Sequence, residues 1–285
     1  MSALQTIWTI TRLTIREAQR RRILWVALFA AIAFLTIYGV GYRFILIEVR
    51  AEMGQGPGPG FNPAQTIAIF LMVAGLYVVH FLGIAMAALL SAGTLSGEVE
   101  SHTIETLLTK PLRRWQVVLG KWLGFAIILF VYMGVMAAGI VLIARFLSGD
   151  RLDNLVPGLA LIYLSALVML GISFLGGTRL STLANGAMAF ALYSLAFIGG
   201  WVEQFGAMLR NNTAVDVGII SSLIMPADAL WKRAVLGWKP TSTDMEMLGP
   251  FFVASQPSPL MTGYAVAYAL VLLVLALWSF SRRDM

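Results

Sequence analysis

Residues 155–177 read LVPGLALIYLSALVMLGISFLGG, a stretch without a single charged side chain. A helix rises about 1.5 Å per residue, so about 20 apolar residues cross a hydrocarbon core about 30 Å thick. Lipid offers the backbone no hydrogen-bond partner, and a helix satisfies its own backbone groups. This stretch therefore predicts a helix that spans a membrane.

Five more stretches of the same kind lie on both sides of it. Their approximate bounds are 23–42, 66–92, 119–146, 183–202 and 262–280. Of the 285 residues, 59% are hydrophobic and 12% charged, whereas soluble domains carry about 25% charged residues. The sequence thus predicts an all-α polytopic membrane protein, with six transmembrane helices in one domain over 23–285.

Basic residues divide unevenly between the two sides that six spans create. With both termini cytoplasmic, the inner segments hold twelve Lys and Arg and five acids, and the outer segments hold eight basic residues and nine acids. The positive-inside rule favours this orientation in a plasma (inner) membrane. Segment 203–261 then lies on the outer face, where we expect a partly re-entrant helix over 226–236 between a proline and a glycine. Four basic residues of this segment weaken the bias: Arg210, Lys232, Arg233 and Lys239.

Residues 1–22 predict an amphipathic helix that lies in the membrane interface. Apolar and small residues recur at helical spacing, while three arginines four residues apart occupy another face. Two interpretations stay open: a basic flank that only sets orientation, or a helix that also touches a cytoplasmic partner. The first face consists of Leu4, Ile7, Trp8, Thr11, Ile15 and Ala18, and the second of Arg12, Arg16 and Arg20.

Residues 96–115 read SGEVESHTIETLLTKPLRRW and lie between the second and third spans. Acids open this stretch and bases close it, which complements a helix dipole, and Pro111 ends the helix before the next span. Ile104, Leu107 and Leu108 form an apolar stripe. A short cytoplasmic helix over 97–110 would be suited to docking on a second protein. Packing of the same helix on its own bundle explains the pattern equally well.

Composition and motifs exclude several chemistries. The chain has no cysteine and only two histidines, which excludes disulfides and Cys- or His-rich metal sites. It contains no Gly-x-x-x-x-Gly-Lys-Ser/Thr phosphate loop and no His-Glu-x-x-His, and we find no paired carboxylate or Ser/His arrangement for an intramembrane enzyme. Because the basic residues are scattered between lipid-length runs, no nucleic-acid partner is expected.

Two features inside the spans have more than one interpretation. His80 falls near the middle of the second span, where ionisable groups usually face the bundle interior. A neutral histidine hydrogen-bonded to a neighbouring helix fits this position, and so does a group that contacts substrate or relays protons. Gly120 and Gly124 form a small-x-x-x-small motif, which is either a subunit contact or a chance pattern.

Stretch 96–115, continued by Val118-Leu119-Gly120-Lys121-Trp122, resembles the segment between spans two and three of the type-2 ATP-binding-cassette exporter permeases. That family repeats a small-Gly-Glu start, a Thr-Leu-Leu core, a Pro-Arg turn and a Gly-Lys. Residues 223–233 are similar to its Asn-Pro-x-Asp stretch, with Met225 in place of the asparagine, and residues 281–285 are similar to its Arg-Arg-Asp tail. Within the family the chain resembles the NosY-like permeases associated with nitrous oxide reductase maturation.

The resemblance implies a non-catalytic membrane subunit of an ATP-driven exporter, with no cofactor of its own. ATP and Mg would bind to a separate cassette ATPase in two copies, and a second copy of this chain or a sister permease would complete the pathway. The alternative is a membrane scaffold that transmits ATPase motion to an outer-face partner. Residues expected to couple to the ATPase are Gly97, Glu98, Glu100, Thr103, Glu105, Leu107, Leu108, Pro111, Arg113 and Arg114.

Overall fold

The computed structural model describes residues 3–53, 63–100, 113–238 and 253–282, with only the backbone described at 52–53 and 92–100. Every regular element in these ranges is a helix, which confirms the all-α class. Six helices are long and apolar enough to cross a membrane: α2, α3, α5, α6, α7 and α10. The helices are α1 (Ala3–Arg20), α2 (Arg22–Met53), α3 (Pro63–Glu100), α5 (Arg114–Leu147), α6 (Leu155–Gly177), α7 (Thr182–Met208), α8 (Asn212–Ile224), α9 (Ala227–Gly237) and α10 (Leu260–Ser281).

Several helices continue beyond the apolar stretches that predicted them. The first span was expected to end near 42, but α2 runs on to Met53. Residues 43–53 contain neither glycine nor proline, so nothing in them stops a helix. At about 1.5 Å per residue, the 32 residues of α2 are longer than a hydrocarbon core is thick. Apolar composition therefore predicted the presence of this helix but not where it ends.

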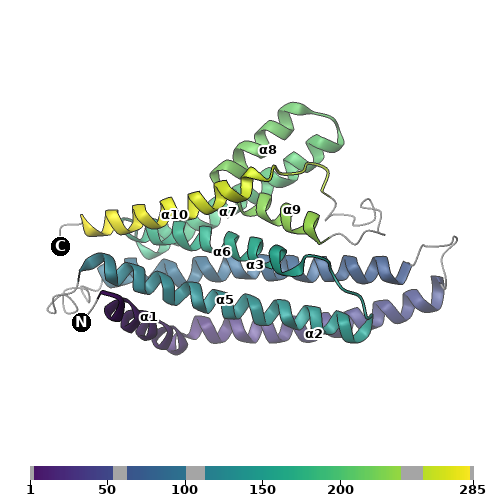
Figure 1. The fold of residues 1–285 in the computed structure, drawn as a ribbon, viewed down its shortest axis with the longest axis horizontal. Helices are drawn as coiled ribbons and strands as arrows, with labels where there is room; N and C mark the ends of the chain where they lie inside the picture. Colours follow the sequence, from purple (N-terminus) through teal and green to yellow (C-terminus); the bar gives the residue numbers. More distant parts are fainter. Residues whose placement is uncertain (1–2, 54–62, 101–112, 239–252, 283–285) are drawn as a thin grey trace.

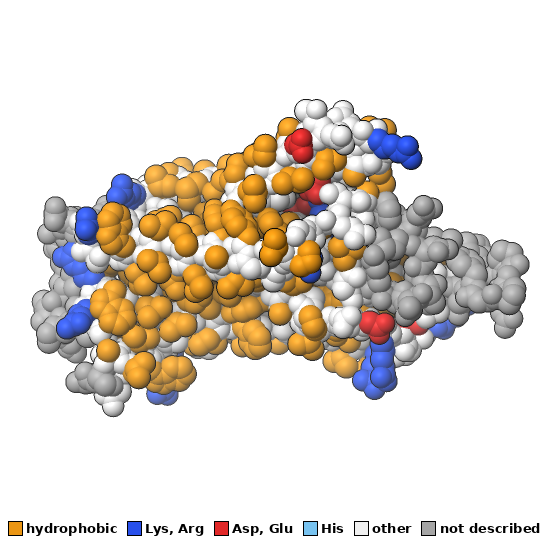
Figure 2. All heavy atoms as spheres, turned by 45° about the horizontal axis from the view of Figure 1, so that its top comes forward, with side chains coloured by type: hydrophobic (Ala, Val, Ile, Leu, Met, Phe, Trp, Pro, Cys, Tyr) orange, Lys and Arg blue, Asp and Glu red, His pale blue; other side chains and the backbone are white. Residues whose placement is uncertain are grey.

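The long helices lie side by side in a bundle, with both chain ends at the same end of the molecule (Figure 1). In the most apolar 18-residue stretch of each helix, 56% is buried in α3 and 6% in α2. Helix α3 is therefore a central span of the bundle, and α2 is a peripheral one. Short connections between α5 and α6 and between α6 and α7 make these helices antiparallel neighbours. Figure 2 shows hydrophobic side chains over the middle of the face and Lys and Arg toward its ends.

Helix α1 packs against the start of α5 through a face that coincides only in part with the predicted apolar face, sharing Thr11 and Ala18 with it. Thr11 Oγ1 donates to the Gly120 carbonyl at 3.0 Å. A Cβ added at Gly120 would lie 2.8 Å from Ile10 Cβ, and one added at Gly124 would lie 2.8 Å from Thr14 Cβ. The glycine pair thus permits close approach of α1 within the chain, rather than a contact between subunits. The buried face consists of Thr6, Thr11, Thr14 and Ala18, while Leu4 and Trp8 are exposed.

Helices α8 and α9 meet at a bend of 104°, a geometry typical of a broken span or a re-entrant loop. The bend follows Met225, and Pro226 directly precedes the first residue of α9. Helix α9 agrees with the helix predicted over 226–236. Two tyrosines of α10 donate hydrogen bonds to the last backbone carbonyls of α8. Tyr264 donates to the Leu223 carbonyl at 2.6 Å, and Tyr268 donates to the Ile224 carbonyl at 2.9 Å. These bonds satisfy carbonyls that a helix end leaves without intrahelical partners.

Candidate functional site

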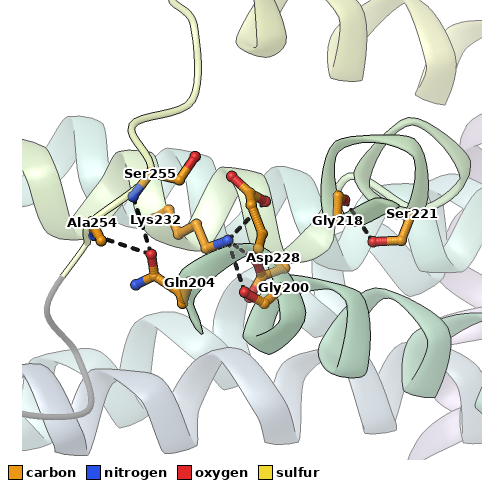
Figure 3. Close-up of polar contacts among 9 residues, drawn as sticks. Gly200, Gln204, Gly218, Ser221, Asp228, Lys232, Ala254 and Ser255 are labelled. Atoms are coloured by element: carbon orange, nitrogen blue, oxygen red, sulfur yellow. Dashed lines mark hydrogen bonds and ion pairs between the residues drawn. The ribbon is translucent and has the colours of Figure 1, made fainter. Parts of the chain in front are cut away.

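Two buried charges and a half-buried one meet where α7 and α9 cross. The ammonium group of Lys232 lies 2.8 Å from Asp228 Oδ2 and 3.0 Å from Glu203 Oε2, and it donates to the Gly200 carbonyl at 3.2 Å (Figure 3). The ammonium therefore donates hydrogen bonds to Gly200 and Glu203 and forms an ion pair with Asp228. Lys232 and Glu203 are 3% and 4% exposed, so both charges depend on this pairing. We call these three residues the ion triad.

Small residues allow the helices of the ion triad to come close. Gly199 faces Ser221 of α8, and Gly200 faces the Asp228 carboxylate of α9; a Cβ at either glycine would collide with that side chain. Asp228 also lies in the first turn of α9, where a negative charge interacts favourably with the helix dipole. Lys232 follows one turn later on the same face. The glycine pair and the bend before α9 thus bring together charges that are distant in sequence.

The ion triad was missed from the sequence. Lys232 was counted there as an outer-face charge that weakened the orientation, whereas the structure buries and pairs it. The sequence also offered no carboxylate pair, yet Glu203 and Asp228 flank one ammonium group. The available signal was an acid and a base four residues apart on one predicted helix, at Asp228 and Lys232. Glu203 lies 25 residues before Asp228 and has no basic residue within one helical turn, so the sequence alone did not indicate that it is paired.

An aromatic cluster lies between α3 and α9. Trp231 of α9 stacks on His80, with ring centroids 5.5 Å apart and an interplanar angle of 23°, and its ring lies edge-on to Tyr77 at 5.0 Å. His80 is 2% exposed, and neither ring nitrogen has a hydrogen-bond partner in the part of the chain that the structure describes. The hydrogen bond to a neighbouring helix that the sequence suggested is therefore not found among those residues. His80 instead contacts α9 through its ring face.

A cleft of about 460 Å³ opens beside the ion triad, between α7 to α9 and the segment before α10. Gln204 Oε1 fastens that segment by accepting from the backbone N–H groups of Ala254, at 3.0 Å, and Ser255, at 3.2 Å (Figure 3). Arg233 Nη1 donates to the Pro257 carbonyl at 3.0 Å. The lining includes Glu203, Ser222, Ala229, Ser255, Met261 and Tyr264.

The predicted coupling residues fall into two groups. Gly97, Glu98 and Glu100 lie in the final turns of α3, which continues unbroken to Glu100, so the first residues of the predicted helix over 97–110 extend α3. Arg113 precedes α5 and its N–H donates to Gln116 Oε1 at 3.4 Å, while Arg114 is the first residue of α5. The other coupling residues lie outside the described residues: Thr103, Glu105, Leu107, Leu108 and Pro111.

The fold and its buried charges define a class of protein: a helical membrane protein with six spans and a polar site inside the bundle. Residues 8–285 match the family model described as ABC-2 family transporter protein, and the chain belongs to this family. It is therefore a multi-pass membrane protein of the ABC-2 transporter family.

One relative is a protein of Pseudomonas aeruginosa named as the probable ABC transporter permease protein NosY. It is 32% identical over 124 residues, which cover 43% of this chain and 40% of the relative. The matched stretch thus spans less than half of either protein, whereas the family model covers nearly the whole chain.

Proposed function

We propose that this chain is the membrane subunit of an ATP-driven exporter in the plasma (inner) membrane, with both termini cytoplasmic. A separate cassette ATPase, in two copies, binds ATP and Mg and hydrolyses ATP. A second copy of this chain or a sister permease completes the pathway. Family membership and the absence of a phosphate loop from the sequence support this division of labour.

The supporting observation is the composition of one end of the bundle. Both chain ends lie there, as do the end of α3 and the start of α5 (Figure 1). Arg12, Arg16 and Arg20 are exposed on α1, and Arg113 and Arg282 are exposed at the start of α5 and the end of α10. An arginine-rich end is cytoplasmic under the positive-inside rule. Segment 97–110 joins two spans at this end, so an ATPase docked on it can move both.

Purification in a mild detergent followed by identification of co-purifying chains tests the proposal. We expect a cassette ATPase to co-purify, and ATP hydrolysis by the purified complex to drive transport in liposomes. Isolation of the chain without an ATPase, together with transport that is independent of ATP, would overturn the proposal.

The alternative is a membrane scaffold that transmits ATPase motion to an outer-face partner. The similarity to the relative named as a probable ABC transporter permease protein NosY favours it, as does the resemblance of the sequence to the NosY-like permeases. Co-purification distinguishes the two proposals: the scaffold requires a third protein bound from the outer side, whereas the exporter requires only permease and ATPase.

A further inference from the structure

The cleft beside the ion triad has the size and lining of a small-molecule site. Its volume of about 460 Å³ lies within the usual range for ligand pockets, about 300–1,000 Å³. Ile219, Leu223 and Met261 supply apolar walls. Glu203 and Ser222 supply polar groups on side chains that are each 4% exposed. Apolar walls with a few buried polar groups are typical of sites that bind amphipathic molecules.

The charges around the cleft favour a positive head group. The ion triad holds two carboxylates and one ammonium, so Lys232 balances only one of its neighbours. The next cation along α9, Arg233, has one Nη donating to the Pro257 carbonyl and does not line the cleft. Glu203 is therefore the charged side chain of the lining.

The uncharged polar groups of the lining can also receive a donor. The hydroxyl of Ser222 is buried and has no hydrogen-bond partner among the described residues, which is unusual for a polar group inside a protein. The Tyr264 hydroxyl donates to the Leu223 carbonyl, which leaves the lone pairs of its oxygen as acceptors. Glu203, Ser222 and Tyr264 thus offer acceptors that a ligand with N–H groups complements.

We propose that this cleft binds a small amphipathic molecule with an ammonium head group. The ammonium donates to the Glu203 carboxylate and to Ser222, and the apolar body lies along Ile219, Leu223 and Met261. An organic cation fits better than a metal ion, because the described residues hold no group of three or more His, Asp or Glu side chains that could bind a metal. This inference rests on the proposed function in one respect: the orientation proposed there determines which side of the membrane the cleft faces.

The chain contains no cysteine, so a single introduced cysteine is the only thiol that a reagent can label. Its reactivity toward charged reagents measures the charge of the cleft. Met261→Cys places a thiol in the lining, and Asn212→Cys places one on an exposed residue of α8 outside it. Each purified variant reacts with a cationic and with an anionic methanethiosulfonate reagent of similar size. When Glu203→Gln is added to Met261→Cys, the labelling rate with the cationic reagent, divided by the rate with the anionic reagent, should fall at least about threefold. The reason is that a cleft focuses the electric field of the charges that line it. In Asn212→Cys the same substitution should leave the ratio unchanged.

Hexylammonium, hexanol and hexanoate then test the ligand class with one apolar chain and three head groups. Hexylammonium should slow labelling of Met261→Cys more than hexanol does, and Glu203→Gln should abolish that difference. Equal protection by hexanol would reduce the cleft to an apolar groove, and stronger protection by hexanoate would assign recognition to Arg233. Either result, or no protection by any probe, overturns the proposal. Co-purification of an ATPase, measured on the same preparations, separates this failure from failure of the proposed function.

Discussion

At the scale of single residues, Lys232 determines whether the two carboxylates of the ion triad, Glu203 buried and Asp228 half-buried, are tolerated. Lys232→Met removes the ammonium and leaves Glu203 and Asp228 facing each other without a counter-charge. Breaking a buried ion pair on one side costs about 3–5 kcal/mol. We therefore expect Lys232→Met to lower the melting temperature of the detergent-purified protein strongly.

Variants in which the carboxylates are replaced by neutral amides provide the control for Lys232→Met. Glu203→Gln leaves the Asp228–Lys232 pair balanced, so its effect should be the smallest of the single substitutions. Combining Lys232→Met with Glu203→Gln and Asp228→Asn removes all three charges and should recover much of the lost stability, because buried ion pairs contribute little net stability over neutral groups. A Lys232→Met protein that melts like the wild type would contradict the pairing.

His80 offers a second test at the residue scale, because its ring contacts are known and its nitrogens have no partner among the described residues. His80→Phe keeps a flat ring against Trp231 and should melt at or above the wild-type temperature. His80→Ala leaves a cavity and should cost about 2–4 kcal/mol, as large-to-small core substitutions do. Equal destabilisation by Phe and Ala in thermal melting would show that the nitrogens are required.

At the scale of elements, the docking of α1 depends on the small size of two α5 residues. Gly120→Leu should push α1 away from α5, because even a Cβ there would meet Ile10 and the Ile7 carbonyl. Trypsin should then cleave faster at the arginines of α1. Gly134→Leu is the matched control on the same helix, since a Cβ there meets nothing within 4 Å. Equal cleavage of the two variants would dismiss this packing.

Segment 97–110 is the element expected to couple ATP hydrolysis to movement of α3 and α5. Exposed ion pairs contribute about 0–1 kcal/mol each, so Glu98→Gln should change little, whereas Glu98→Arg with Glu105→Arg should weaken ATPase binding by like-charge repulsion. Leu107→Asp should uncouple hydrolysis from transport without preventing membrane insertion. Pull-down of the ATPase and substrate-stimulated hydrolysis in liposomes measure both effects. Full binding and stimulation in the double reversal and in Leu107→Asp would refute the coupling assignment.

The elements were predictable from sequence wherever one local property decided them. Apolar length located the spans, and Pro226 and Gly237 framed α9. The contacts between elements were less predictable. Threonine is ambiguous between surface and core, so the Thr11 bond to α5 was not expected. Glu203 and Lys232 are 29 residues apart and meet only because the chain bends before α9 and Gly200 lets the helices approach.

For the whole molecule, burial shows which basic residues the orientation argument can count. Lys232 had counted against the proposed outer side, but its charge is neutralised by its carboxylate partners and does not face solvent. Arg233 is likewise tied to the Pro257 carbonyl. Lys121, counted on the inner side, is also buried, so burial removes one basic residue from each side and leaves the bias about as the sequence count gave it.

Single cysteines at the two ends of the molecule test this orientation directly. Thr213, at the start of α8, and Ser281, at the end of α10, are both exposed, whereas Ala229 of α9 is 3% exposed and would be a poor reporter. An impermeant maleimide should label Thr213→Cys in intact cells and leave Ser281→Cys unlabelled. In inverted membrane vesicles the pattern should reverse. Labelling of Ser281→Cys from outside would place the arginine-rich end on the outer face, where no ATPase that hydrolyses cytoplasmic ATP can reach segment 97–110.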